Sequence, residues 1–166
     1  PHNMALAIAA CEAAGRIKQR SKVRLGVGKA SLPGRFQRVS HQGRDYLLDG
    51  AHNEDAAQAL VDSLRELPEW PVKTVLLTGM LSGHAASGFY EPLATLVDEA
   101  HFVPIDFHRS RDPLELEREV GWLFERSLAH KSLEEGLEAA LSAGAGLVLV
   151  TGSYYLVGEV GRKLGL

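Results

Sequence analysis

GLVLVTGSYYLVGEVGRKL, at residues 146–164, holds the clearest strand of the sequence and the helix that follows it, and it therefore decides the fold class. Residues 146–151 form an almost continuous apolar run, which is typical of a strand buried on both faces of a parallel sheet. Small polar residues end this strand, and apolar residues at helical spacing then predict a helix over 153–164. A strand that leads directly into a helix is half of a βαβ unit.

The same alternation of strands and helices extends back to residue 32. Further strands are predicted at 36–40, 45–48, 72–78 and 101–105, and further helices at 53–67, 90–99, 113–124 and 133–143. The third of these strands is mostly apolar, as expected when both faces are covered. Strands that alternate with helices of ten residues or more indicate an α/β fold with a Rossmann-like, mostly parallel sheet and helices on both faces.

The first 31 residues differ from the rest and are predicted to form a leader. Residues 4–14 are rich in Ala and contain no helix breaker, which predicts a helix, and a basic connector then runs through 26–28. The sequence does not begin with Met and opens inside a helical pattern, so we expect a piece of a longer protein. The predicted division is a segment at 1–31 followed by one full domain at 32–166.

The composition fits a globular domain in a reducing compartment. Hydrophobic residues make up 45% of the 166 residues and charged residues 23%, so a sizeable core can form. The only cysteine is Cys11, which excludes an intrachain disulfide framework and a multi-cysteine metal cluster and suits a cytoplasmic protein. The seven histidines show no metal-ligand spacing, and no apolar run approaches the roughly 18 residues of a membrane span. We therefore expect no structural metal and no membrane partner.

Positive charge is concentrated in one part of the chain, although the net charge is −3. Between residues 13 and 44 no acidic residue occurs, whereas this stretch holds half of the Lys and Arg residues: Arg16, Lys18, Arg20, Lys22, Arg24, Lys29, Arg35, Arg38 and Arg44. Two interpretations remain open. The stretch is either a face that meets polyanions, nucleotide phosphates or nucleic acid, or a solvated linker.

A phosphate loop is excluded at the one place that suggests it, GVGKAS at Gly26–Ser31. The motif needs a glycine five positions before the glycine of its Gly-Lys pair, but Val23 stands there, and Ala30 stands where it needs Ser or Thr. The dinucleotide fingerprint fails as well, because its third glycine would fall at Ser31. We therefore expect no ATP hydrolysis from this chain alone.

Polar residues gather where predicted strands pass into helices. Asp49–Asn53 (DGAHN) follows the strand at 45–48, and Thr151–Tyr155 (TGSYY) follows the strand at 146–151. Ligands of doubly wound sheets bind at such carboxyl ends, where N–H groups at the start of the next helix can receive anionic oxygens. Pro33–Arg35 stands before the first strand and offers a guanidinium for phosphate. Roles in turns and helix caps explain the same residues equally well.

Taken together, three segments resemble the signature sequences of the folylpolyglutamate synthase and dihydrofolate synthase family, within the Mur ligase group. The segments are LPGRF at 32–36, LDGAHN at 48–53 and VTGSYYLVGEV at 150–160. Residues 1–10 are similar to the end of the family's central ATPase domain, so the resemblance covers the whole chain. It implies that residues 32–166 have the fold of a Mur ligase C-terminal domain.

The resemblance implies an ATP-dependent ligase that adds L-glutamate to folate or dihydropteroate. ATP activates the acceptor carboxylate as an acyl phosphate, which the amine of glutamate attacks to form an amide. The implied cofactors are ATP and Mg²⁺, and the implied partners are the substrates and the protein's own N-terminal ATPase domain, with no nucleic acid or membrane among them. The phosphate loop, the Mg²⁺ ligands and the pterin site belong to that N-terminal part, so the chain alone is expected to be inactive.

The resemblance also implies roles for particular residues. Arg35 corresponds to an arginine that contacts ATP phosphate, and Asp49 corresponds to an aspartate that contacts the nucleotide. His52 and Ser153 correspond to residues near the incoming amino acid. Asn53 is included with these two as a substrate-binding residue, because its amide can donate to a phosphate or a carboxylate. No catalytic residue and no metal ligand is assigned within this chain.

One departure from the family pattern lies after the third predicted strand. The family usually has a Lys-Asp pair after a Gly-x-Leu stretch, whereas Gly79–Leu81 is followed here by SGHAA. His84 is a candidate substitute for the absent lysine. Arg109 and Arg111 follow the next predicted strand, and either they bind a glutamate carboxylate or they are solvated.

Two other functions remain open from the sequence. One is a non-catalytic Rossmann-like module that binds a nucleotide, and the other is the C-terminal domain of another Mur-type ligase with a different amino-acid substrate. A phosphate loop encoded upstream would distinguish a ligase from a binding module. A ligation assay with glutamate would distinguish the two kinds of ligase.

Overall fold

The chain consists of two compact units, Pro1–Leu32 and Pro33–Leu166, in a computed structural model that describes residues 2–17, 19–67 and 73–166. The first unit holds two helices, α1 (His2–Ala13) and α2 (Arg20–Lys29). α1 lies where a helix was predicted, but α2 shows that the predicted basic connector is wrong. Two glycines in α2 lower helix propensity by about 1 kcal/mol each, yet the Arg, Lys, Val and Leu residues around them are compatible with a helix. Within the described residues, no helix combines the length and the apolar character needed to cross a membrane.

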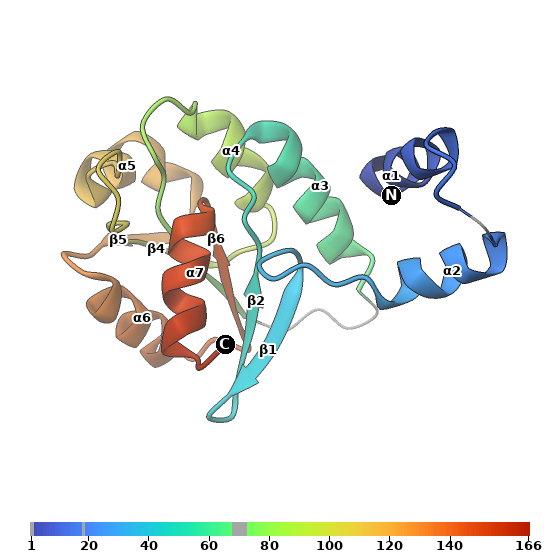
Figure 1. Cartoon of the computed structure of the whole chain (residues 1–166). Helices are drawn as coiled ribbons and strands as arrows, with labels where there is room; N and C mark the ends of the chain where they lie inside the picture. The colour runs from blue at the N-terminus through green and yellow to red at the C-terminus, as the bar shows by residue number, and fades with distance from the viewer. Residues whose placement is uncertain (1, 18, 68–72) are drawn as a thin grey trace. The chain divides into compact units, whose positions relative to one another are not determined.

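The second unit is built on a six-stranded sheet with the strand order β1-β2-β6-β3-β4-β5 (Figure 1). The strands are β1 (Gln37–His41), β2 (Arg44–Leu48), β3 (Thr74–Thr78), β4 (Glu99–Phe102), β5 (Arg126–Ala129) and β6 (Leu147–Thr151). All neighbours are parallel except β1 and β2, which form an antiparallel hairpin. The hairpin turns at Gln42 and Gly43, whose φ angles of 49° and 72° suit a two-residue type I′ turn. The predicted mostly parallel sheet is confirmed.

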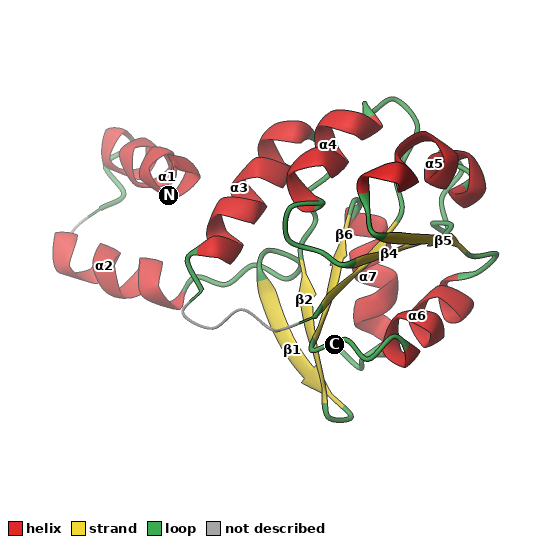
Figure 2. Ribbon diagram, turned by 180° about the vertical axis from the view of Figure 1, so that it is seen from behind, coloured by secondary structure: helices red, strands yellow, loops and turns green. Residues whose placement is uncertain are grey.

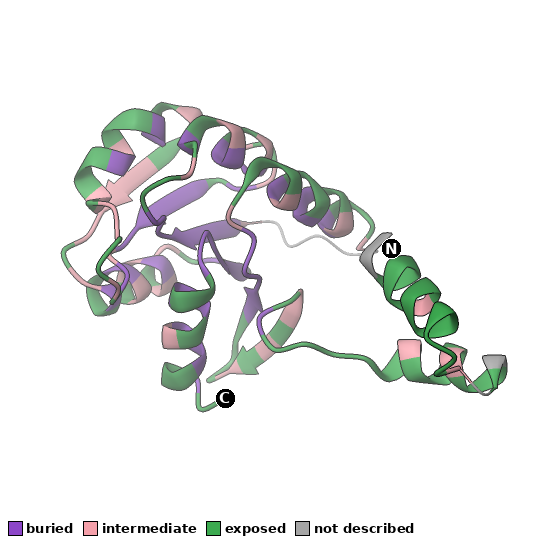
Figure 3. Ribbon diagram, turned by 45° about the horizontal axis from the view of Figure 1, so that its top comes forward, coloured by how far each residue is buried: buried purple, intermediate pink, exposed green. Residues whose placement is uncertain are grey.

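Helices cover both faces of this sheet (Figure 2). The helices on one face are α3 (Glu54–Arg65), α4 (Ala86–Leu93) and α5 (Pro113–Val120), and those on the other are α6 (Leu133–Ser142) and α7 (Tyr154–Lys163). Successive residues of the central strands point into opposite core layers. In β6, for example, Leu149 packs in the layer of α3 to α5, while Val148 and Val150 pack in the layer of α6 and α7. The central strands are therefore buried along their whole length (Figure 3).

Two elements differ from their predicted bounds. The helix predicted at 90–99 is α4, which begins four residues earlier and ends directly after Pro92, since Phe89 and Leu93 must both reach the core. The strand predicted at 101–105 is β4 and begins at Glu99. A carboxylate is tolerated in this buried strand because Lys73 Nζ lies 3.3 Å from it.

β5 has no counterpart among the predicted strands. Its four residues form the edge of the sheet, and none of them is fully buried. A short edge strand needs no apolar run, so the hydrophobic pattern contains no signal for it. The helix predicted at 113–124 is correspondingly shorter: α5 ends at Val120, and a 3-10 turn over Gly121–Leu123 leads into β5.

Candidate functional site

The candidate site lies at the edge of the sheet where the parallel strands end. The loops after β2, β3, β4 and β6 all leave from this edge. β6 lies between β2 and β3 in the sheet. The loop after β6 leads to α7 on one face, whereas the loops after β2 and β3 lead to α3 and α4 on the other face, so a crevice can form between these loops. Such a point is the usual place for a ligand in a doubly wound sheet. Because β1 is antiparallel to β2, the residues that precede β1 also lie at this edge.

Asp49 ties the start of β1 to the end of β2. The residue is 7% exposed; its Oδ1 accepts a hydrogen bond from Ala51 N at 2.8 Å, and its Oδ2 accepts one from Phe36 N at 2.8 Å. Both carboxylate oxygens therefore hold the backbone, and one of them fixes the residue next to Arg35. The nucleotide contact expected of Asp49 stays a prediction.

Arg35 is exposed and reaches the start of α7. Its guanidinium carbon lies 4.7 Å from the centre of the Tyr154 ring, which is a cation–π contact. The backbone beneath is tight, because Gly50 N donates to Gly34 O at 2.8 Å and a Cβ on Gly50 would lie 2.4 Å from the Tyr154 ring. Within the described residues no carboxylate pairs with this guanidinium, so its N–H groups are free to meet a phosphate.

His52 and Asn53 lie between β2 and α3 and do different things. Nδ1 of His52 is 2.9 Å from the carbonyl oxygen of Gly50. Because a carbonyl only accepts, Nδ1 carries the proton, and Nε2 of the neutral ring is left as an acceptor. Asn53 caps α3, since its Oδ1 accepts from Ala56 N at 2.9 Å. The amide of Asn53 is thus turned toward its own helix.

Ser153 begins α7 and is buried. Its Oγ accepts from Tyr155 N at 3.1 Å and caps the helix. The residue before it is held closely, because Gly152 N donates to Ala51 O at 2.9 Å. Gly152 has a φ of 105°, and a Cβ there would lie 2.4 Å from the carbonyl oxygen of Gly79. Only glycine allows the ends of β6 and β3 to approach each other in this way.

A buried chain of hydrogen bonds supports the same edge from inside. Thr78 Oγ1 donates to Thr151 O at 2.9 Å, so the hydroxyl of Tyr90, 3.0 Å from Thr78 Oγ1, is the donor in that contact. Burial raises the pKa of Tyr90, and the bond to Thr78 lowers it by a smaller amount, so the phenol keeps its proton. The chain joins α4 to the ends of β3 and β6 and makes this edge rigid.

A cavity of about 170 Å³ opens between the strand-end loops. It is lined by His52, Leu81, His84, Arg109, Gly152, Ser153, Tyr154 and Tyr155. The rings of His52 and His84 meet edge to face, with their centroids 5.3 Å apart. None of these lining residues is acidic, so the cavity favours an anionic group. The structure thus brings His52 and Ser153 together, places Arg35 against one wall, and leaves Asp49 and Asn53 outside the lining.

The aromatic residues that form walls of this cavity are not among the predicted site residues. Tyr154 and Tyr155 are 39% and 49% exposed, and the ring of Tyr155 stacks on that of Phe107 with centroids 4.2 Å apart. Two adjacent tyrosines directly after a strand end are a usable signal, because exposed aromatic rings are typical of binding surfaces. Phe107 carries no such signal, since its neighbour in space is distant in sequence.

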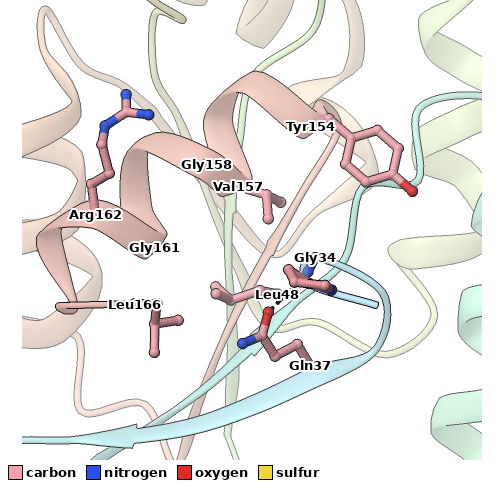
Figure 4. Close-up of a pocket in the computed structure, with 10 residues that line it drawn as sticks. Gly34, Gln37, Leu48, Tyr154, Val157, Gly158, Gly161, Arg162 and Leu166 are labelled. Atoms are coloured by element: carbon pink, nitrogen blue, oxygen red, sulfur yellow. Dashed lines mark hydrogen bonds between the residues drawn. The ribbon is translucent and has the colours of Figure 1, made fainter. Parts of the chain in front are cut away.

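A second cavity, of about 340 Å³, shares Tyr154 and lies between the start of β1 and α7 (Figure 4). It is lined by Pro33, Gly34, Gln37, Leu48, Tyr154, Val157, Gly158, Gly161, Arg162 and Leu166. Its walls are mostly apolar, and the Gln37 Oε1 atom already accepts from Gly34 N at 2.8 Å. Arg162 is the charged residue of this lining, whereas His52, His84, Arg109 and Ser153 give the smaller cavity the more polar walls.

Within the part of the chain that the structure describes, no group of three or more His, Cys, Asp or Glu side chains is arranged to hold a metal ion. The exposed guanidinium of Arg35 suits the phosphates of a nucleotide. Oxygen ligands for an accompanying Mg²⁺ are not gathered among the described residues.

Fold and site define a doubly wound α/β domain with a cationic cavity at the ends of its parallel strands. The family described as Mur ligase, glutamate ligase domain, matches residues 34–154. Because this match spans most of the chain, the chain belongs to that family, and the resemblance seen in its sequence is confirmed.

Several proteins are similar to this chain over most of its length. The dihydrofolate synthase/folylpolyglutamate synthase of Escherichia coli (strain K12) is 31% identical over 160 residues, which cover 95% of this chain and 36% of the relative. A solved structure of E. coli FolC in complex with DHPP and ADP matches with a TM-score of 0.85 at 29% identity, over 98% of this chain and 38% of that one. Mycobacterium tuberculosis folylpolyglutamate synthase, complexed with ADP and AMPPCP, shares the fold with a TM-score of 0.88 at 22% identity, over 97% of this chain and 39% of its own. The chain thus spans about a third of the length of these relatives.

Proposed function

We propose that this chain is the C-terminal domain of an ATP-dependent ligase that adds L-glutamate to folate or dihydropteroate through an acyl phosphate. The observation that carries the proposal is the cationic cavity in which His52 and Ser153, from two separate signature segments, lie together. Arg35, from the third segment, lies against its wall. The similarity to dihydrofolate synthase/folylpolyglutamate synthase supports the same function. In this proposal residues 1–31 are the end of the central ATPase domain, and residues 32–166 are the C-terminal domain.

The proposed roles follow from where charge develops during the reaction. Arg35 pairs with phosphate oxygens of ATP and neutralises their charge. The glutamate amine then attacks the carbon of the acyl phosphate; the C–N bond forms, the C–O bond to phosphate breaks, and inorganic phosphate leaves. His52 lines the cavity with Nε2 free as an acceptor, so it can take the proton that the attacking amine loses.

The proposed cofactors are ATP and Mg²⁺, and the proposed place of action is the cytoplasm. Mg²⁺, when bound, supplies charge neutralisation at the phosphates. Its ligands, like the phosphate loop and the pterin site, are proposed to lie in the N-terminal part of the full-length protein. Folate or dihydropteroate, L-glutamate and that N-terminal part are the proposed partners.

Two measurements test the proposal. The coding sequence upstream of residue 1 should contain a Gly-Lys-Ser/Thr phosphate loop, and the full-length protein should ligate glutamate to dihydropteroate or tetrahydrofolate with one phosphate released per amide. The 166-residue chain alone should turn over no ATP, which makes it the control. Ligation of a different amino acid in place of glutamate would identify another Mur-type ligase. Nucleotide binding with no phosphate loop and no ligation would identify a binding module.

A further inference from the structure

The cavity contains a cation that the proposed function leaves without a role, Arg109. The loop that carries it folds back onto the loop after β3, where Ser82 N donates to Arg109 O at 2.8 Å. Two residues further on, Arg111 N donates to Met80 O at 2.9 Å. The main chain from Arg109 to Arg111 is therefore tied to the loop that carries His84, and Arg109 lines the cavity.

The side chain of Arg109 is positioned by aromatic rings and has no acidic partner. Its guanidinium carbon lies 5.7 Å from the centre of the Phe107 ring, which in turn stacks on Tyr155. Across the described residues no carboxylate forms an ion pair with Arg109, whereas the guanidinium of Arg111 pairs with Glu119. The charge of Arg111 is therefore neutralised by Glu119, whereas the charge of Arg109 is available to a ligand.

The size and the charge of the cavity suit a small anion with a planar acidic group. Its volume of about 170 Å³ is well below the roughly 300–1,000 Å³ of cavities that hold drug-sized ligands, so it matches a ligand of amino-acid size. A guanidinium binds a carboxylate through two parallel hydrogen bonds, and no acidic side chain lines the cavity to compete for it. Arg35, the proposed phosphate contact, touches Tyr154 but does not line this cavity.

We propose that Arg109 binds a carboxylate of the incoming amino acid and thereby selects an acidic substrate. This inference rests on the proposed ligase function and names the residue that determines amino-acid specificity. Arg109 acts on substrate binding and takes no part in activation of the acceptor carboxylate by ATP.

Kinetics of the full-length protein test the inference. We expect Arg109→Ala to raise the KM for L-glutamate about tenfold or more, with the KM for ATP unchanged, because a charge-assisted pair is lost from the amino-acid site alone. Arg109→Lys keeps the positive charge but cannot form two parallel hydrogen bonds with a carboxylate. Its KM for L-glutamate should therefore lie between those of the wild type and Arg109→Ala. Arg118→Ala is the matched control, since it removes an exposed arginine of α5 that does not line the cavity. Thermal unfolding checks that each variant is folded.

Inhibition by L-glutamine identifies which carboxylate is bound. If Arg109 holds the side-chain carboxylate, Arg109→Ala loses the preference for glutamate over glutamine, and this result supports the inference. If binding of both amino acids weakens in parallel, Arg109 holds the α-carboxylate that all amino acids share, and its role in selecting an acidic substrate is overturned. An unchanged KM for glutamate in folded Arg109→Ala, or an equal rise in the KM for ATP, overturns it. If the wild-type protein ligates no glutamate, the proposed function and this inference are both overturned. If the wild type is active but Arg109→Ala has an unchanged KM for glutamate, only the inference is overturned.

Discussion

At the scale of single residues, the strand-end site depends on a few atoms with little free space around them. The two oxygens of Asp49 each hold a backbone amide, and Gly152 occupies a left-handed conformation beside a carbonyl oxygen of the next strand. These contacts leave Arg35 as the exposed cation at the start of β1. Residues that shape the site are therefore separable, by mutation, from residues that meet a ligand.

Arg35→Ala in the full-length protein tests a ligand contact. We expect kcat/KM for ATP to fall about 100-fold, because a guanidinium that meets developing phosphate charge is lost. The stability of the domain should change little, since the side chain is exposed. Arg38→Ala removes an exposed positive charge three residues away and is the matched control. Unchanged turnover together with unchanged ATP affinity would count against the assignment of Arg35.

Gly152→Ala tests a contact that shapes the site. We expect it to lower the free energy of unfolding by about 3–4 kcal/mol, because a left-handed backbone is combined with a clash against the Gly79 carbonyl. Gly144→Ala is the control: its φ is also positive, at 75°, but no atom lies within 4 Å of its Cβ, so strain of about 1–2 kcal/mol is the whole cost. Urea denaturation measures both. Equal losses in the two variants would mean that the close approach of β6 to β3 contributes nothing.

At the scale of elements, β4 and β5 share a polar cluster around the buried side chains of Glu99 and His101. The Glu99 carboxylate lies 3.3 Å from Lys73 Nζ and 3.5 Å from Arg126 Nη1. His101 Nε2 is 3.2 Å from Glu99 Oε1 without the alignment of a directed hydrogen bond, so this contact is electrostatic. His101 Nδ1 lies 2.8 Å from His130 Nε2. The cluster joins β4 to the edge strand β5 through polar contacts in place of an apolar run.

This cluster makes stability depend on pH. Burial, and then the neighbouring His130, lower the pKa of His101 from 6.5 to about 4, although Glu99 raises it by a smaller amount; burial also lowers the pKa of His130. A depressed pKa means that the unfolded chain binds more protons between these values. We therefore expect stability to be full above pH 6.5 and to fall, by up to about 3 kcal/mol, as the pH drops toward 4.

Urea denaturation of the chain at several pH values measures this loss. His101→Gln removes the titrating group, so the variant should lose stability less steeply between pH 6.5 and 4 than the wild type does. His108→Gln, at an exposed position, should keep the wild-type slope. A slope that is the same in all three proteins would show that His101 does not cause the acid sensitivity.

At the scale of the whole molecule, the second unit contains its own core. The residues of both core layers lie between Phe36 and Leu164. A domain of this size can bury enough surface to fold alone.

Expression of residues 33–166 alone tests this division. We expect cooperative unfolding with a midpoint within about 4 °C of that of the 166-residue chain, which corresponds to a change of less than about 1 kcal/mol. Differential scanning calorimetry measures the midpoint, and circular dichroism compares the helix content. Loss of a cooperative transition would mean that Pro1–Leu32 completes the fold.

Elements that are built from apolar runs, and the motifs at their ends, can be predicted from the sequence. β3 and β6 are visible because residues buried on both faces must be apolar, and Asn53 and Ser153 mark helix starts because unpaired N–H groups need an acceptor. The sequence did not reveal β5 or α2, because an edge strand and an exposed helix need no such run. The three signature segments indicated the family because each of them is a run of consecutive residues.

Which of these residues share a cavity depends on how the chain folds in three dimensions. Arg109 and Arg111 carry the same side chain, and the difference between them arises from Glu119, which pairs with one and not the other. His84 meets His52 because β2 and β3 both run parallel to β6, so the loops that follow them leave the sheet at the same edge. Charge pairing and cavity shape depend on neighbours that are distant in the chain, whereas hydrophobic periodicity and helix caps depend on neighbours within a few residues.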